Sequence, residues 1–187
     1  MKKTVCLMSL LLALILLAAC GNGAQETPDA LEALDYAAEK AEATDSFLSQ
    51  LPDGNAVVLL CSAPAAGQMR KTLFFSHDGG ENWADGLDLT ESIGNYPVGA
   101  IFLTPQRGFV LTDYHGVDDY LYATSDGGAS WESVGLPLAG STFSYIEGRE
   151  IRYENGTLYL SLAGKTETSI THLRFRSDDG GVTWLAY

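Results

Sequence analysis

One eight-residue phrase occurs three times in this chain, and it constrains the fold more than any other feature of the sequence. The copies span residues 76–83, 124–131 and 177–184, and each fits Ser/Thr-x-Asp-x-Gly-x-x-Trp. All three tryptophans of the chain occupy the last position of a copy. The copies are about 50 residues apart, a period typical of solenoids and propellers built from one repeated supersecondary unit.

Each fixed position of the phrase suits a tight hairpin turn. The hydroxyl and the carboxylate can accept backbone N–H groups that the turn leaves unpaired. Glycine adopts the positive φ that other residues avoid. The indole then begins the outgoing strand and covers the turn with a large apolar face. The sequence therefore predicts three equivalent turns, each between two strands.

The phrase resembles the Asp-box of BNR (bacterial neuraminidase) repeats, which sialidases, sortilin-type receptors and photosystem II assembly-factor propellers share. The resemblance covers about residues 46–187 and implies an all-β fold, a β-propeller-like array of about three four-stranded blades with Asp-box hairpins. It also implies that the box is a structural staple between the third and fourth strands of a blade, away from the ligand-binding face. The residues that would form the staples are Ser76, Asp78, Gly80, Trp83, Thr124, Asp126, Gly128, Trp131, Ser177, Asp179, Gly181 and Trp184.

Short apolar runs separated by turn residues begin at Ser46, which is typical of an all-β domain, here residues 46–187. Phe74, Tyr122 and Phe175 each stand two positions before a box, which indicates units that stack through matching layers. The predicted strands are 47–50, 56–61, 70–76 and from 83 onward; then 98–103, 109–113, 120–124 and 131–134; then 143–146 or 150–153, 157–162, 173–177 and 184–187.

Three units are fewer than the four to eight blades with which a propeller typically closes. An open array would leave two apolar faces in water, which monomers rarely tolerate. A helix could cap one end, a second chain or a partner protein could complete the ring, or residues 84–97 and 135–150 could hold further strands. We expect self-association first, because it supplies the missing blades.

The N-terminus carries the pattern of an export signal. Two lysines precede an apolar run at residues 7–19, and Leu-Ala-Ala stands directly before Cys20. This ending resembles the bacterial lipobox, which implies cleavage before Cys20 and lipidation of its thiol. An ordinary secretory signal or a membrane-spanning helix is the alternative, although a span needs about 20 apolar residues. We expect a signal peptide at 1–19 and a lipid-anchored protein on the extracytoplasmic side of a bacterial cell membrane.

A tether and a helix are expected next. Residues 20–27 are short and polar, which suits a tether. Thr27 and Pro28 offer a helix N-cap and a first helical position, and residues 28–45 are rich in strong helix formers. This short N-terminal helix would be either a spacer or a lid over an exposed blade edge.

The charge and the cysteine content disfavour a nucleic-acid partner and an intrachain disulfide. Loss of the signal would remove two of the 11 basic residues and none of the 24 acidic ones, and so strong a negative charge disfavours nucleic acid. Cys61 is the only cysteine besides Cys6 in the signal and Cys20 at the anchor, so no intrachain disulfide is expected in the mature chain. Because Cys61 lies in an apolar run, we interpret it as a buried structural thiol.

A sialidase-like glycoside hydrolase is the enzymatic alternative. By resemblance, such an enzyme needs three arginines, a Tyr–Glu nucleophile pair, an acidic Asp and an F/Y-R-I-P motif. The chain has six arginines but no F/Y-R-I-P, and its alternation of arginines with apolar residues at 173–176 is typical of a solvated strand face. We therefore expect no catalytic residues and no cofactor, and keep a hydrolase or a degenerate glycan-binding relative as the alternative.

Two polar segments are the candidate ligand-binding sites. One is the loop at 113–120 with Tyr114, His115 and Asp118, whose residues suit a divalent cation but whose spacing matches no standard metal loop, so no metal is expected. The other contains Tyr145 and Arg149, in a setting that suits a glycan or a peptide. The sequence as a whole predicts a non-catalytic binding or assembly module on an Asp-box scaffold, anchored to a membrane.

Overall fold

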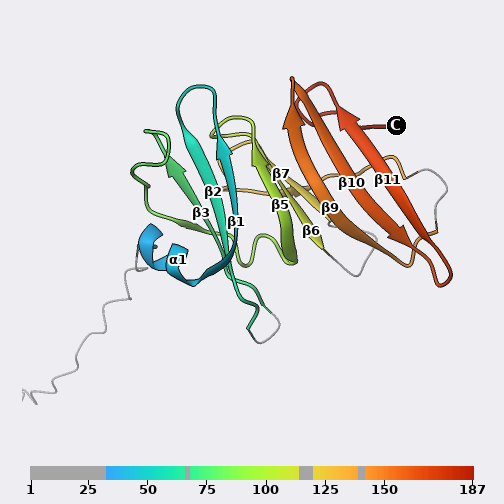
Figure 1. Ribbon diagram of the computed structural model, residues 1–187, viewed down its shortest axis with the longest axis horizontal. Helices are drawn as coiled ribbons and strands as arrows, with labels where there is room; N and C mark the ends of the chain where they lie inside the picture. Colours follow the sequence, from blue (N-terminus) through green and yellow to red (C-terminus); the bar gives the residue numbers. More distant parts are fainter. Residues whose placement is uncertain (1–32, 66–67, 114–119, 139–141) are drawn as a thin grey trace, which may run out of the picture. The chain divides into compact units, whose positions relative to one another are not determined.

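The computed structural model describes residues 33–187, except 66–67, 114–119 and 139–141. The expected signal peptide, the tether, Cys20 and the expected helix start at Thr27 and Pro28 lie outside the described residues. No helix in the described part of the chain is both long enough and apolar enough to cross a membrane. The unit Ala33–Tyr187 is all-β apart from one short helix (Figure 1).

The strands form three consecutive four-stranded antiparallel meanders. The first meander, β1–β4, is a sheet of its own, whereas β5–β8 and β9–β12 are joined into one sheet by a single residue pair, Asp113 with Glu147. The bounds are α1 Tyr36–Glu42, β1 Ala43–Gln50, β2 Ala56–Ser62, β3 Lys71–Ser76, β4 Leu87–Asp88, β5 Tyr96–Phe102, β6 Gly108–Asp113, β7 Leu121–Thr124, β8 Glu132–Ser133, β9 Tyr145–Glu154, β10 Thr157–Lys165, β11 Ile170–Ser177 and β12 Leu185–Ala186.

The boundaries differ from the sequence expectation in three places. Helix α1 begins at Tyr36, after an N-cap at Asp35, and ends at Glu42, because Ala43 already has extended backbone and pairs with β2. The third unit starts with one continuous strand, β9, where we expected either of two shorter ones. The fourth strands are two residues long and begin after the tryptophans, because the turn hydrogen bonds still hold the residue before each indole.

Side chains of alternating direction place an apolar layer on both faces of β2. Val57 and Leu59 pack toward the second meander, and Val58 and Leu60 pack toward α1. All four are at most 2% exposed. Strand β2 is therefore covered on both faces.

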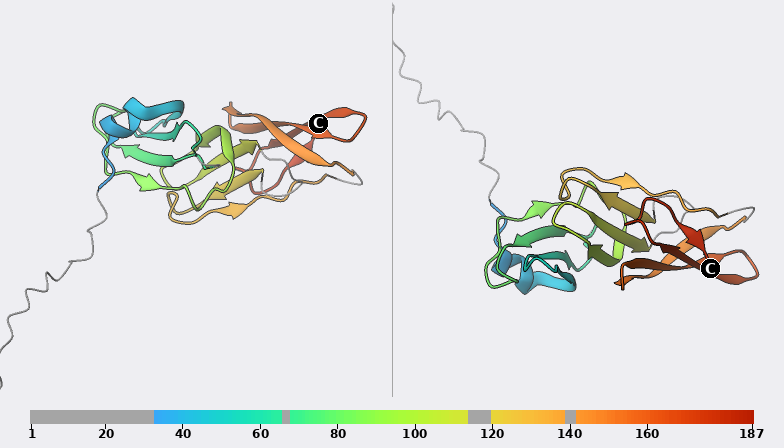
Figure 2. Two further views of the ribbon diagram at one scale, coloured as in Figure 1. Left: turned by 90° about the horizontal axis from the view of Figure 1, so that it is seen from below. Right: turned by 90° about the horizontal axis from the view of Figure 1, so that it is seen from above.

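The core consists of three layers that follow one another along the chain. One layer lies between α1 and the first meander, the next between the first and second meanders, and the last between the second and third (Figures 1 and 2). Phe74, Tyr122 and Phe175 contribute to these layers in that order. Each predicted equivalent aromatic thus faces the element that precedes its own meander, and the described chain has a propeller-like arrangement.

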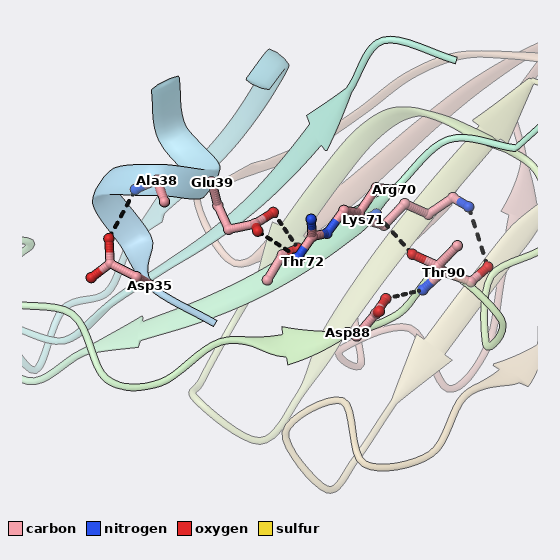
Figure 3. Close-up of polar contacts among 8 residues, drawn as sticks. All are labelled: Asp35, Ala38, Glu39, Arg70, Lys71, Thr72, Asp88 and Thr90. Carbon is pink, nitrogen blue, oxygen red and sulfur yellow. Dashed lines mark hydrogen bonds and ion pairs between the residues drawn. The ribbon is translucent and has the colours of Figure 1, made fainter. Parts of the chain in front are cut away.

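Helix α1 occupies the place of a preceding meander against β1–β4. Tyr36 stacks on Trp83, with ring centroids 4.8 Å apart, and meets Phe74 edge-on at 5.3 Å. Glu39 pairs with Arg70 at 2.6 Å and accepts a hydrogen bond from the Thr72 hydroxyl at 3.0 Å (Figure 3). The helix therefore covers the outer face of the first meander, whereas we expected either a spacer or a lid over a blade edge.

Candidate functional site

The three box turns, residues 76–83, 124–131 and 177–184, have the same hydrogen-bond pattern. In the first, the Ser76 hydroxyl accepts the Gly80 N–H at 2.8 Å and donates to Asp78 Oδ1 at 2.7 Å. The Asp78 carboxylate also accepts the backbone N–H of Asn82 at 2.9 Å and its side-chain amide at 2.6 Å. The corresponding hydroxyl, carboxylate, glycine and polar residues of the other turns are Thr124, Asp126, Gly128 and Ser130, and Ser177, Asp179, Gly181 and Thr183.

These hydrogen bonds keep the box carboxylates ionised. Donation from the backbone N–H and side-chain amide of Asn82 lowers the pKa of Asp78 to about 2. Donation from the hydroxyl and N–H of Ser130 lowers the pKa of Asp126 to about 2, and donation from the Thr183 hydroxyl lowers that of Asp179. Carboxylates held this way act as acceptors that close a turn, and they are poorly suited to donate a proton.

The second glycine of the second and third boxes lies against the preceding meander, and the tryptophan of each box lies in the core layer on that side. A Cβ on Gly128 would lie 2.8 Å from Leu73 Cδ2 in the first meander. A Cβ on Gly181 would overlap the Phe109 ring in the second meander. Trp184 meets Phe109 of the second meander edge-on at 6.1 Å, and Trp131 meets Phe102 of its own meander edge-on at 6.3 Å in the layer shared with the first meander. The box residues are thus committed to turn closure and layer packing.

A second polar group lies where the second and third meanders meet. We call it the Glu147 cluster: Asp113, Tyr145, Glu147, Arg149 and Lys165. The Glu147 side chain forms ion pairs with both Arg149 and Lys165, and Glu147 is only 9% exposed. The Lys165 ammonium also lies 5.0 Å from the centroid of the Tyr145 ring. Two of the sequence candidates, Tyr145 and Arg149, are therefore brought together by this cluster.

The register of β9 against β10, together with a bulge in β9, positions the side chains of the Glu147 cluster. Lys165 at the end of β10 pairs with Tyr145 at the start of β9, and Ala163 pairs with Glu147. The register then shifts so that Arg149 is the extra residue between Gly148 and Glu150, and such bulges redirect side chains.

The close approach of β9 to β6 adds Asp113 to the Glu147 cluster. Gly148 permits this approach, since a Cβ there would lie 2.8 Å from Leu111 Cγ and nearer still to the Thr112 carbonyl oxygen. The same approach pairs Glu147 with Asp113, whose Oδ1 is buried without a hydrogen-bond partner in the described part of the chain.

The strand ends place this cluster opposite the box turns. The boxes follow the ends of β3, β7 and β11, which pair with the starts of β2, β6 and β10. Asp113 and Lys165 instead stand at the ends of β6 and β10, and Tyr145 stands at the start of β9. The loop that follows Asp113 contains Tyr114, His115 and Asp118, which lie outside the described residues.

The electrostatics of the cluster suit binding better than proton transfer. A hydrogen bond from Lys165, helped by the Arg149 charge, lowers the pKa of Glu147, although burial opposes this. The same hydrogen bond raises the pKa of Lys165. A glycosidase acid requires a raised pKa instead. At neutral pH the cluster therefore presents fixed charges and an aromatic ring.

Sequence reasoning missed Lys165 as a site residue, and it placed Asp113 in the other candidate segment, the loop at 113–120, and not with Tyr145 and Arg149. Lys165 and Asp113 are each the polar residue that ends an apolar strand, but only the strand register shows which partners they meet. Burial raises the pKa of the Cys61 thiol to about 12, which agrees with a structural thiol. Among the described residues, no three His, Cys, Asp or Glu side chains lie close enough together to hold a metal ion.

Comparison with known proteins found no match to a family model and no match among curated proteins. A similar solved structure is that of the GH43 BlXynB protein from Bacillus licheniformis, with 14% sequence identity and a TM-score of 0.42. The match covers 72% of this chain and 27% of that one, so the chain spans about a quarter of the length of that protein.

Proposed function

We propose that this protein is a non-catalytic binding or assembly module, built on an Asp-box propeller scaffold of about three blades. Each meander would be one blade and each box turn its staple between the third and fourth strands. A lipid on Cys20 would hold the module on the extracytoplasmic side of a bacterial membrane. The BNR-repeat resemblance of residues 46–187 supports the scaffold, and the lipobox resemblance before Cys20 supports the anchor.

The observation that carries the proposal is the Glu147 cluster. It places a nearly buried carboxylate and two cations at the junction of two meanders, on the side away from the box turns. The Glu147 carboxylate orients both cations, while the Arg149 side chain is 50% exposed and can also meet a ligand, which favours a binding role. The Tyr145 ring beside Lys165 adds an apolar surface on which a sugar or a peptide side chain could rest.

A glycan array and a fluorogenic sialoside test this function together. We expect the wild-type protein to retain specific array ligands and to leave the sialoside intact. Tyr145→Ala should weaken retention, whereas Tyr153→Ala on the same strand should not, because Tyr153 is 44% exposed and outside the cluster. Turnover of the sialoside that is lost in Glu147→Gln would overturn the proposal in favour of the hydrolase alternative.

Lipidation and assembly have separate tests. Labelling of cells with an alkyne fatty acid should mark the wild-type chain and not Cys20→Ala. We further propose that a second copy or a partner protein completes the ring of blades. Light scattering should then show a dimer or a larger complex, and a monomer that binds no apolar dye would remove this part of the proposal.

A further inference from the structure

The outer face of β9–β11, which points away from the second meander, has a composition unlike the covered faces. Leu158, Leu160 and Leu162 of β10 pack inward, while Tyr159 and Ser161 point the other way and are half-buried. On β11, Phe175 packs inward and Arg174 and Arg176 are exposed. This face is thus a patterned polar surface that carries arginines and tyrosines, on a chain whose formal charge is −13.

A pocket of about 270 Å³ is hollowed into this face. Its floor is Ser161, which pairs with Glu150 on one neighbouring strand and with Arg174 on the other. Because adjacent strands lie about 4.8 Å apart, the backbones of Glu150 and Arg174 are separated by roughly 10 Å across the small serine. The pocket therefore has a carboxylate on one side and a guanidinium on the other, with a hydroxyl between them.

One wall of the pocket is preorganised by ring contacts. The Arg152 guanidinium lies 4.3 Å from the centroid of the Tyr159 ring, and Tyr159 meets Tyr187 edge-on at 6.0 Å. Arg152 is also held by ion pairs to Glu150 and Glu154. These contacts hold an aromatic wall beside Ser161, so a ligand would meet a surface that needs little ordering.

Arg174 is the available cation of the pocket. The other arginines use their guanidinium groups within the protein: Arg70, Arg149, Arg152 and Arg176 in ion pairs and Arg107 in hydrogen bonds to carbonyl groups. In the described part of the chain, the Arg174 guanidinium makes neither an ion pair nor a hydrogen bond. Its planar donor fork is suited to bidentate binding of a carboxylate.

We propose that this pocket binds a small molecule that carries a carboxylate together with nearby hydrogen-bond donors. The carboxylate pairs with Arg174, the donors face Glu150 and the Ser161 hydroxyl, and the carbon skeleton rests against Tyr159 and Tyr187. The volume corresponds to about nine waters, which matches one amino acid or one sugar acid. Both share this chemistry, since one offers an ammonium and the other hydroxyl groups. The site uses no residue of the Glu147 cluster, so it can exist whether or not that cluster binds a ligand.

The test is a titration of the purified protein, followed by calorimetry and by NMR shifts of the Ser161 and Arg174 amides. The probes are L-leucine for the amino acid source and D-glucuronate for the sugar acid source. Glucose, which lacks the carboxylate, and propionate, which lacks the donors, are the controls. We expect at least one of the first two to bind and both controls to bind much more weakly.

The matched variants are Arg174→Gln and Arg176→Gln. Arg176 stands two residues further on the same face, pairs with Asp178 and lies outside the pocket. We expect Arg174→Gln to weaken binding by about tenfold or more, as for a hydrogen bond to a charged group, and Arg176→Gln to leave it nearly unchanged. Ser161→Leu should also abolish binding, because the leucine side chain would fill the pocket. Position 161 is already half-exposed, so the near-ultraviolet circular dichroism spectrum of this variant should stay unchanged.

Three results would overturn the proposal. One is the absence of binding of both acids up to about 10 mM, ten times the Kd of about 1 mM that marks a weak complex. Another is equal binding of glucose or propionate. The last is a pattern among the variants in which Arg174→Gln and Arg176→Gln lose binding equally or Ser161→Leu binds fully.

Discussion

Alanine substitution at the second glycine of each box gives a graded test of the layer packing. Gly80, Gly128 and Gly181 occupy the same turn position, with φ of +100°, +90° and +83°. The three glycines differ in the atoms that an added Cβ would contact. At Gly80 it would lie 3.3 Å from Trp83 of the same turn, whereas at Gly128 it would lie 2.8 Å from Leu73 of the preceding meander. At Gly181 it would lie 2.7 Å from Phe109 Cε1 and nearer still to Cζ.

The expected losses of stability separate a backbone component from a packing component. An alanine at positive φ costs about 1–2 kcal/mol at each site. Overpacking adds about 1–3 kcal/mol where neighbours cannot move. Phe109 is such a neighbour, because it is fully buried and meets both Trp184 and the Arg107 guanidinium. We therefore expect losses of about 1–2 kcal/mol for Gly80→Ala, about 2–4 for Gly128→Ala and about 3–5 for Gly181→Ala.

Urea unfolding of the purified protein, followed by tryptophan fluorescence, measures these differences. Gly156→Ala isolates the backbone component, because Gly156 has φ of +88° and no atom within 4 Å of the added Cβ. Gly94→Ala, which also meets nothing and lacks a positive φ, should change stability very little. If all three box variants lose no more stability than Gly156→Ala, the boxes do not contact the preceding meanders and the layer assignment is wrong.

Three further predictions concern acid, the helix and the free thiol. Hydrogen bonds lower the pKa of Asp78 and Asp126 to about 2, so their stabilising effect is complete above about pH 4 and lost as pH falls toward 2, which circular dichroism against pH should show. Tyr36→Ala should lower stability by about 2–3 kcal/mol through lost burial and ring contacts, and Tyr153→Ala by less than about 0.5, in the same urea assay. Cys61, which is fully buried, should react with a thiol reagent only as fast as the protein unfolds, and rapid labelling of the native protein would contradict this.

Local sequence was sufficient to predict the turns and the order of strands. The box residues close hydrogen bonds within eight residues of one another, so their pattern is visible without the fold. The aromatic equivalence of Phe74, Tyr122 and Phe175 also follows from alignment on the boxes. What the alignment could not give is the direction in which these rings point, because that depends on which face of each sheet the neighbouring layer covers.

Contacts distant in sequence were beyond prediction. Tyr145 and Arg149 were identified as candidates, but Lys165 joins them only through the β9–β10 register and the bulge at Arg149. The helix was expected over residues 28–45, yet Ala43 belongs to β1, because pairing with Ser62 outweighs the helix propensity of alanine. The arginine-bearing face of β9–β11 was interpreted as a solvated face, and its pocket depends on Ser161 standing between Glu150 and Arg174.

The central claim is that α1 and the three meanders pack in chain order, with each box tryptophan in the layer between its own meander and the element before it. Nuclear Overhauser spectra of the labelled protein test it directly. We expect ring contacts of Trp83 with Tyr36 of α1 and of Trp184 with Phe109 of the second meander, and a contact of Trp131 with Phe102 inside the layer that the first and second meanders share. The absence of the Trp83–Tyr36 contact or of the Trp184–Phe109 contact, each of which joins a box to the element before its meander, would contradict the account.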